Sequence, residues 1–323
     1  MRRRGFILLI GSAAVAWPVI ELRSQSGKIF HLGILTNTRS FEVEEFLKGL
    51  RDHGYVEGQN LIVEYRFSEG YGERWPKLAS ELVAFRVDAI FVLTTPTALA
   101  AKHATNEIPI IISTALEPVG AGLAANLAHP GGNVTGMSLM APELGGKHLS
   151  LFKEAIPSLH RVAVLWNAAN PAFTNVRQDV NEVARSIGLT LVSQPVREPE
   201  DFTAAFAALA ENRPDGLLIL LDALVGQHIA QIAEFAAREH LPIVSAFSPR
   251  TRLGGLMSYG TNIAAACRKA AESGDRVFRG ENPRDLPFQN PTTFELVINL
   301  KTAKALGITL PQSILERADE VIE

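Results

Sequence analysis

From residue 28 onward, the chain alternates short continuous apolar runs with longer stretches in which apolar residues recur every three or four positions. Residues 88–93, Asp-Ala-Ile-Phe-Val-Leu, form one such run, which is typical of a strand buried on both faces. Residues 41–53 instead have approximately helical spacing and are followed by Gly54, a helix terminator. Strands are predicted at residues 29–35, 60–67, 88–93, 109–114, 134–139, 161–166, 189–196, 216–221 and 242–247.

Helices are predicted between these strands, and such alternation indicates parallel sheets covered by helices on both faces. The order begins again after residue 139, which predicts two lobes, each with its own sheet. We expect the pieces after residue 250 to return and complete the sheets, so that the chain crosses between the lobes more than once. The expected helices span residues 41–53, 75–85, 95–101, 119–127, 143–155, 172–187, 199–210, 226–239 and 264–279, with further strands at 254–260 and 293–299 and a last helix from Leu300.

The first residues are predicted to be a leader rather than part of the first lobe. Three arginines at positions 2–4 precede an apolar stretch at residues 6–17, which has the length of a signal-peptide core and is too short to span a membrane comfortably. Residues 3–7, Arg-Arg-Gly-Phe-Ile, also fit a twin-arginine export pattern. We therefore predict an export signal over residues 1–27 and a periplasmic protein, with the twin-arginine and general secretory routes both open.

The composition is that of an ordered globular protein. Of its 323 residues, 47% are hydrophobic and 20% are charged, which is enough to bury a sizeable core. The formal net charge of -3 shows no basic excess, so we expect no nucleic-acid partner. The single cysteine, Cys267, excludes an internal disulfide and a cysteine-based metal site, and its alanine-rich surroundings indicate a packing residue.

The junction after the strand at residues 88–93 contains three threonines and a proline. Thr95 can act as the N-cap of the next helix, and Pro96 suits its first turn, where a missing N–H costs nothing. Free N–H groups at a helix start favour an anion such as a carboxylate, and open α/β sheets bind ligands at this edge. Two interpretations stay open: a capped strand–helix junction, or a ligand contact.

Polar residues recur at the carboxyl ends of the predicted strands in both lobes. Each alone is explained by a cap or a turn, but their recurrence at this edge favours a binding site. Hydroxyl, amide and carboxylate groups on two facing lobes suit a small polar or zwitterionic ligand. The candidate ligand-binding residues are Thr36, Asn37, Thr94, Thr95, Thr97 and Glu117 in the first half and Asn167, Asn170, Asp222 and Ser245 in the second, with Tyr259 or Phe247 as an apolar wall.

Two of these places are expected to hold the charged ends of a zwitterion. The junction at residues 94–97 offers hydroxyls and a helix N-terminus, which suit a carboxylate. Asp222, expected to face a wet cleft from the other lobe, offers a partner for an ammonium group. The ligand would then bridge the lobes and favour their closure.

Motifs for catalysis and for cofactors are missing from the sequence. The turn after the first strand, residues 36–40, has no glycine, which argues against a dinucleotide site, and no Walker loop is present. The residues around Ser258 do not match a G-x-S-x-G nucleophile elbow. The eight histidines show no i, i+4 pair, so a metal site is not expected. We expect no cofactor and no metal, and an α/β enzyme is the less favoured alternative.

Segments spread nearly end to end carry a resemblance to a known family. They are residues 2–18, Gly-Tyr-Val-Glu-Gly-Gln-Asn at 54–60, Thr-Pro-Thr-Ala-Leu-Ala at 95–100, Pro-Gly-Gly-Asn-Val-Thr-Gly at 130–136, Gly-Gly-Leu-Met-Ser-Tyr-Gly at 254–260 and Phe-Glu-Leu-Val-Ile-Asn-Leu-Lys-Thr-Ala at 294–303. With them the chain resembles the ABC-transporter substrate-binding proteins of the periplasmic-binding-protein type I fold. Members of the tryptophan-binding kind are the nearest.

The resemblance implies two Rossmann-like lobes with parallel sheets, joined by a three-crossing hinge, and a ligand captured by hinge closure. We place lobe 1 at residues 28–139 plus 250–287 and lobe 2 at residues 140–249 plus 288–323. The implied function is that of an exported, monomeric receptor that delivers an amino acid or related solute to an ABC permease in the inner membrane. The family's ligand contacts correspond here to Thr36, Thr94, Thr95, Thr97, Asn167, Asp222 and Tyr259.

The chain departs from the family pattern at two places. Residues 117–119 are Glu-Pro-Val where the family usually has Asp-Pro-Val, and the extra methylene of Glu117 could alter the pocket. The leader ends in Val-Ile-Glu-Leu-Arg at residues 19–23 rather than in an alanine-rich cleavage site, which bears on export. An effector-sensing regulator with the same binding fold is the other alternative, although only the leader precedes the first strand, where a DNA-binding headpiece would be expected.

Overall fold

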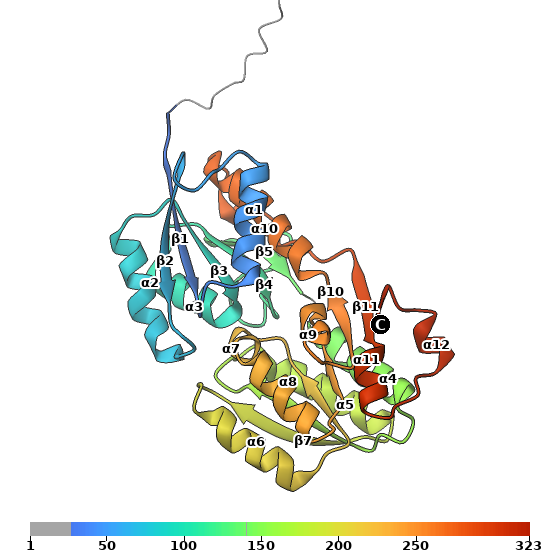
Figure 1. Ribbon diagram of the computed structural model, residues 1–323. Helices are drawn as coiled ribbons and strands as arrows, with labels where there is room; N and C mark the ends of the chain where they lie inside the picture. The colour runs from blue at the N-terminus through green and yellow to red at the C-terminus, as the bar shows by residue number, and fades with distance from the viewer. Residues whose placement is uncertain (1–26, 140) are drawn as a thin grey trace, which may run out of the picture.

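The computed structural model describes residues 27–139 and 141–323, which form two α/β lobes (Figure 1). The two sheets and the helices that cover them confirm the predicted α/β class with two lobes. The predicted export signal lies outside the described residues except for Gly27. No helix within the described part of the chain is long and apolar enough to cross a bilayer.

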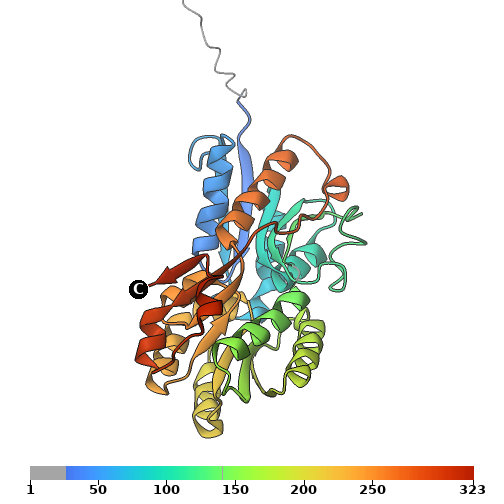
Figure 2. The same ribbon diagram turned by 90° about the vertical axis from the view of Figure 1, so that its right-hand side faces the viewer.

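Lobe 1 is a five-stranded parallel sheet in the order β2-β1-β3-β4-β5. Helices α1 and α10 pack side by side on one face, and α2 and α3 cover the other (Figure 2). Its elements are β1 (Phe30–Thr36), α1 (Phe41–Asp52), β2 (Leu61–Phe67), the 3-10 helix η1 (Gly72–Arg74), α2 (Trp75–Ala84), β3 (Ala89–Thr94), α3 (Thr95–Ala104), β4 (Ile110–Ala115), β5 (Val134–Ser138), α10 (Ile263–Phe278) and the 3-10 helix η2 (Pro283–Asp285).

Lobe 2 repeats this plan, because β7-β6-β8-β9-β10 have the same order as the strands of lobe 1, and β11 and β12 extend the sheet. Its strands pair in parallel except β10 and β11, which are antiparallel because β11 enters the sheet on its return from lobe 1. Its elements are α4 (Ala141–Ala155), β6 (Arg161–Asn167), α5 (Phe173–Ser186), β7 (Thr190–Val196), α6 (Asp201–Asn212), β8 (Gly216–Ile219), α7 (Ala223–Gln227), α8 (Ile229–Arg238), β9 (Ile243–Ser245), α9 (Ser248–Arg252), β10 (Met257–Thr261), β11 (Phe294–Asn299), α11 (Leu300–Ala305), α12 (Gln312–Leu315) and β12 (Glu320–Ile322).

The described chain passes between the lobes three times. The first crossing joins β5 to α4, the second joins β10 to α10 at Asn262, and the third joins η2 to β11. The predicted lobe-1 segment at residues 250–287 is therefore divided between the lobes. Its first part, with most of α9 and all of β10, belongs to lobe 2, because the chain leaves that lobe only after β10 has completed its place in the sheet.

Two expected helices differ from the observed structure. Residues 119–127 form successive turns, because Gly122 has a φ of 74° and its N–H bonds only three residues back, to the Val119 oxygen, so no helix propagates. The helix expected at residues 226–239 is divided between α7 and α8. The break is at His228, whose backbone, with a φ of -99° and a ψ of 12°, is not helical.

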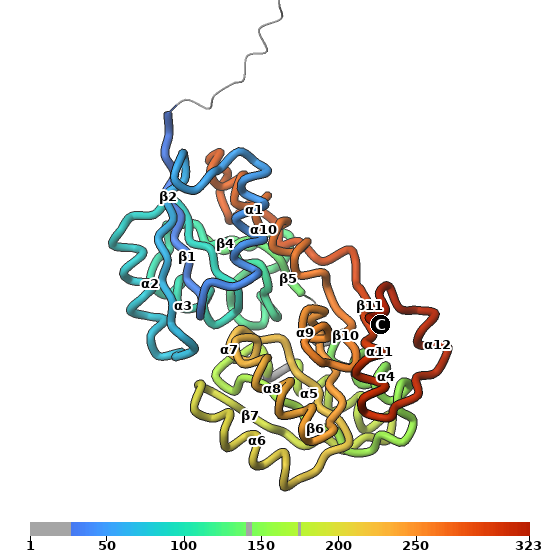
Figure 3. Tube along the Cα trace, viewed as in Figure 1, coloured from blue at the N-terminus to red at the C-terminus, as the bar shows by residue number. Residues whose placement is uncertain are grey.

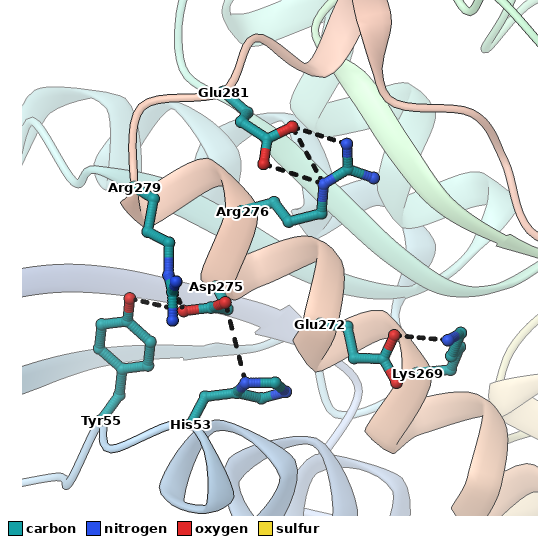
Figure 4. A network of polar contacts seen from close by, with 8 residues as sticks. All are labelled: His53, Tyr55, Lys269, Glu272, Asp275, Arg276, Arg279 and Glu281. Atoms are coloured by element: carbon teal, nitrogen blue, oxygen red, sulfur yellow. Dashed lines mark hydrogen bonds and ion pairs between the residues drawn. The ribbon is translucent and has the colours of Figure 1, made fainter.

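A partly buried polar network ties α10 to the end of α1 after the second crossing (Figure 4). Tyr55 Oη donates to Asp275 Oδ1 at 3.0 Å, and Arg279 Nε donates to the same oxygen at 2.8 Å. Nδ1 of His53 lies 3.8 Å from Asp275 Oδ2. Burial, followed by the hydrogen bond to Asp275, raises the pKa of Tyr55 to about 12. These contacts hold α10 on lobe 1, so that only the short connections between the lobes are left to bend.

One buried histidine lies beside the second crossing. Nε2 of His148, in α4, hydrogen-bonds the backbone oxygen of Tyr259 in β10, so the neutral ring carries its proton on Nε2. The residue is 2% exposed, and its Nδ1 has no hydrogen-bond partner among the described residues. Burial lowers the pKa of His148 to about 4, so the ring stays neutral in the native protein near neutral pH.

We expect this histidine to make stability depend on pH. Between about pH 6.5 and about pH 4 the unfolded chain binds a proton at His148 that the native state cannot. Stability is therefore fully present above this window and falls as the pH drops through it, by about 3 kcal/mol in all. Urea unfolding of the wild type and of His148→Gln measures the effect, because the variant should show a flatter profile. Parallel profiles for the two proteins would contradict this expectation.

Candidate functional site

A cavity of about 320 Å³ lies between the lobes, and a second compartment of about 130 Å³ adjoins it. We call the two together the interlobe cavity. In lobe 2, α7 and α9 lie on the side that faces lobe 1 (Figure 3). The main compartment is lined by Asn37, Thr38, Ser40, Phe41, Glu42, Leu93, Thr94 and Thr114 and by Leu221, Asp222, Ala223, Gly226, Gln227, Ile229, Phe247, Pro249, Arg250, Leu253 and Ile263. The two compartments share Asn37, Thr94, Asp222 and Ala223.

The cavity lies where the strand order of each sheet reverses. In lobe 1 this point is between β1 and β3, whose ends bring Asn37 and Thr94 to the cavity. In lobe 2 it is between β6, which ends at Asn167, and β8, which is followed by Asp222. Helices leave neighbouring strands toward opposite faces at such a point, which opens a crevice at the carboxyl edge of the sheet. The repeated fold thus brings four of the predicted residues together.

The lobe-1 wall combines a fixed amide with a capped helix start. Ser68 Oγ donates to Asn37 Oδ1 at 2.8 Å and fixes that side chain. The Thr94 N–H donates to Thr97 Oγ1 at 3.2 Å, and the Thr97 hydroxyl donates to the Thr94 carbonyl at 2.8 Å. The capping interpretation of this junction is therefore observed, but the N-cap is Thr94 rather than Thr95, and Thr94 also borders the cavity. Thr94 uses its N–H in the cap, and Pro96 has none. The junction therefore offers an anion fewer N–H donors than the sequence suggested.

Asp222 is held from several directions at the start of α7. Its Oδ1 accepts from Asn167 Nδ2 at 3.0 Å and from the Leu224 N–H at 2.8 Å, and its Oδ2 accepts from Asn170 Nδ2 at 3.0 Å. The residue is 4% exposed although it lines both compartments of the cavity, so it faces the cleft as expected but is shielded from solvent more than the sequence suggested. The reason is that β6 and β8 are neighbours, so the loop after β6 covers the carboxylate with amide donors.

Arg250 lines the same cavity from α9, and the sequence-based search did not include it. Its side chain is 2% exposed, and burial lowers its pKa to about 10 against the opposing charges of Glu42 and Asp222. It therefore remains a cation at neutral pH. The signal in the sequence was an arginine three residues after Phe247, close to the carboxyl end of an apolar strand, whereas the last candidate in this stretch was Phe247.

Apolar side chains border the cavity from both lobes. Phe41 at the start of α1 is 48% exposed, and Leu253 after α9 is 55% exposed, although both line the main compartment. Phe247, Ile229 and Ile263 add to this apolar surface. The interlobe cavity can therefore hold a ligand that has both a polar end and an apolar part.

Seven of the predicted residues do not line the cavity. Most of them brace the loops around it: Thr95 Oγ1 donates to the Leu116 oxygen at 3.0 Å, and the Tyr259 ring stacks on Phe294 with the centroids 6.0 Å apart. Neighbouring residues on a strand point to opposite faces, so recurrence at strand ends could not tell lining residues from bracing ones. The seven are Thr36, Thr95, Thr97, Glu117, Asn170, Ser245 and Tyr259.

The lobes also touch at the rim of the cavity, away from the three crossings. Tyr71 Oη in lobe 1 donates to Glu200 Oε1 in lobe 2 at 2.7 Å. Gly70, with a φ of 95°, packs so closely on lobe 2 that a Cβ there would lie 3.0 Å from Pro199 Cγ and 3.2 Å from Leu224 Cδ1. These contacts between lobes belong to a closed arrangement. Within residues 27–139 and 141–323, no group of three or more His, Cys, Asp or Glu could hold a metal ion.

Comparison with known proteins gives consistent matches along the chain. A family model described as "ABC transporter substrate binding protein" matches residues 35–322. A tyrosine-binding protein of Clostridioides difficile (strain R20291) is 28% identical over 263 residues, which cover 81% of this chain and 75% of that protein.

Two solved structures show how the lobes compare. A domain from Streptococcus pneumoniae in complex with L-Trp is 25% identical, with a TM-score of 0.83, over 91% of this chain and 100% of that one. A ligand-free, open substrate-binding protein with adhesive properties from Clostridium difficile is also 25% identical, over 91% of this chain and 99% of that one. Its TM-score is only 0.62. At equal identity, the whole chain superposes better on the complex than on the open protein.

Proposed function

This chain belongs to the ABC transporter substrate-binding protein family, and from that premise we propose that it is the exported receptor of an ABC importer. It captures a small zwitterionic solute, an amino acid or a related molecule, between its lobes and delivers it to a permease in the inner membrane. It works in the periplasm as a monomer, and it acts by capture rather than by catalysis.

The observation that supports this most directly is the Asp222 carboxylate at the interlobe cavity. Three donors occupy part of its acceptor capacity, and a carboxylate offers about four lone-pair sites. The ammonium group of a ligand would donate to the remaining lone-pair site, in a buried place where charge-assisted hydrogen bonds are strong. The apolar surface around Phe41 and Leu253 would cover the rest of the solute.

Closure of the lobes supplies the mechanism. A ligand that contacts both lobes makes all its contacts only in the closed form, so binding shifts the population toward that form. The higher TM-score against the L-Trp complex than against the ligand-free, open protein supports closure as the ligand-binding state. The names of the relatives, one tyrosine-binding and one in complex with L-Trp, make aromatic amino acids the first solutes to test.

Native mass spectrometry of the purified mature protein should identify a retained amino acid or related zwitterion. Calorimetry with L-tyrosine, L-tryptophan and an aliphatic amino acid then measures the affinities. A retained ligand without any cationic group, together with no heat from the amino acids, would overturn the proposed ligand class. A gene pair for a permease and an ATPase beside this one would support delivery to an importer.

The rim contact should contribute modestly to affinity. Tyr71→Phe removes the hydroxyl that bonds Glu200 across the lobes, and we expect a loss of affinity of about threefold, the scale of an exposed contact. Tyr65→Phe is the matched control, because its hydroxyl bonds Glu57 within lobe 1 at 3.0 Å, and it should leave affinity unchanged. Equal affinities for the two variants in calorimetry would show that the rim contact does not favour closure.

A further inference from the structure

Arg250 holds a positive charge that the described residues compensate incompletely. Its Nε and Nη1 atoms, which together carry three of the five guanidinium N–H groups, are buried and have no hydrogen-bond partner among the described residues. Nη2 donates only to the backbone oxygen of Asp222, at 3.4 Å. A buried cation without a paired anion destabilises a folded protein. Its presence at a cavity therefore points to a role other than structure.

The groups that face Arg250 come from both lobes. Glu42 in α1 of lobe 1 and Asp222 in lobe 2 are the carboxylates whose charges act on it. Among the described residues the Asp222 side chain accepts from Asn167, Asn170 and Leu224, and the guanidinium donates only to the Asp222 backbone oxygen. The Phe247 ring lies 5.6 Å from the guanidinium carbon and supplies only a weak cation–π contact.

We propose that Arg250 binds the anionic group of the ligand, the carboxylate when the ligand is an amino acid, and so makes closure of the lobes depend on that group. The proposal rests on the proposed function for the nature of the ligand. It places both charged ends of a zwitterion against lobe 2, with the ammonium at Asp222 and the carboxylate at Arg250. Arg250 thereby replaces the junction at residues 94–97 as the proposed carboxylate site, because the Thr94 N–H at that junction is already used in the helix cap.

The consequence for closure follows from desolvation. In the arrangement observed here Arg250 is buried, so a protein that closes without an anion must bury an incompletely paired charge. A carboxylate supplies acceptors for the free N–H groups and offsets that charge. The open form is then favoured until an anionic ligand enters.

The test compares Arg250→Met, which removes the charge at similar size, with Arg250→Lys, which keeps it. Arg252→Met is the matched control, because this cation lies on the same helix but pairs with Glu320 at 2.6 Å on the surface. Calorimetry measures binding of L-tyrosine and of L-tyrosinamide, which lacks the carboxylate. Small-angle X-ray scattering measures the radius of gyration of each ligand-free protein, and thermal unfolding measures its stability.

We expect Arg250→Met to weaken binding of L-tyrosine at least tenfold, the scale of a charge-assisted hydrogen bond, and to bind L-tyrosinamide about as well as the wild type does. Arg250→Lys should recover part of the affinity for L-tyrosine. Ligand-free Arg250→Met should be more compact than the wild type and at least as stable, because an unpaired buried charge is gone. Arg252→Met should match the wild type in all these measurements.

Two results would overturn the role of Arg250 and leave the proposed function in place. One is an unchanged affinity of Arg250→Met for L-tyrosine, and the other is an equal loss for the acid and the amide. If the wild type binds no amino acid, the ligand class fails, and the scattering comparison then decides the role of Arg250. An unchanged radius of gyration in ligand-free Arg250→Met would overturn it in that case too.

Discussion

Asp222→Asn is expected to weaken ligand binding about tenfold or more and to lower the stability of the ligand-free protein by about 1–3 kcal/mol. The affinity falls because the neutral amide no longer attracts an ammonium group. The stability falls because asparagine replaces one of two acceptor oxygens by an NH₂ donor. That donor would face Asn170 Nδ2, or else Asn167 Nδ2 and the Leu224 N–H, each of which donates to Asp222 in the native protein.

The neighbouring amides cannot simply flip to accommodate the change. Asn167 Oδ1 accepts from the Ala169 N–H at 2.8 Å, and Asn170 Oδ1 accepts from the Ala172 N–H at 3.1 Å. A flip of either side chain would place its NH₂ group against a backbone donor and lose that bond.

Calorimetry and urea unfolding of Asp222→Asn measure both effects. Asp215→Asn is the matched control, because Asp215 precedes β8 at the opposite end of the strand from the cavity and accepts from the His160 and Arg161 N–H groups. The control should lose stability but keep its affinity. An Asp222→Asn protein that binds as tightly as the wild type would show that the ligand's cationic group lies elsewhere.

Gly260→Ala is expected to destabilise lobe 2 by about 3 kcal/mol and to disturb the second crossing. The added methyl group would meet backbone atoms, and no side chain could move aside to make room for it. A Cβ at this position, near the end of β10, would lie 2.2 Å from the Ala246 carbonyl oxygen and 2.9 Å from its carbon. Relief requires β10 to move away from the end of β9, and β10 leads directly into the connection to α10. Closure, which depends on that connection, should be impaired as well.

Thermal unfolding of Gly260→Ala, compared with that of Gly132→Ala, measures the loss of stability. Nothing lies within 4 Å of a Cβ at Gly132, so the same change there should be neutral or slightly stabilising. Equal melting temperatures for the two variants would mean that β9 and β10 separate more easily than their packing indicates.

The lobes were predictable because their signals are local in the sequence. Buried parallel strands are continuously apolar, and their helices carry a face at helical spacing, so the alternation around β3 and α3 was visible without any contact. The exceptions are places where local pattern is weak. Residues 119–127 have helical composition, yet the turn at Gly122 prevents a helix, and β10 was assigned to lobe 1 because strand order in space cannot be read from a run of apolar residues.

The sequence by itself determined where ligand groups could lie, because polar residues after parallel strands must meet at one edge of each sheet. It could not determine what those groups contact. Asp222 was expected to face a wet cleft, and it does line the cavity, but two asparagines bury it because β6 and β8 are neighbours. Arg250 was not among the predicted site residues, because the free N–H groups of a buried guanidinium become evident only when the positions of all its neighbours are known. Burial and pairing depend on residues distant in the chain, so only the tertiary structure decided them.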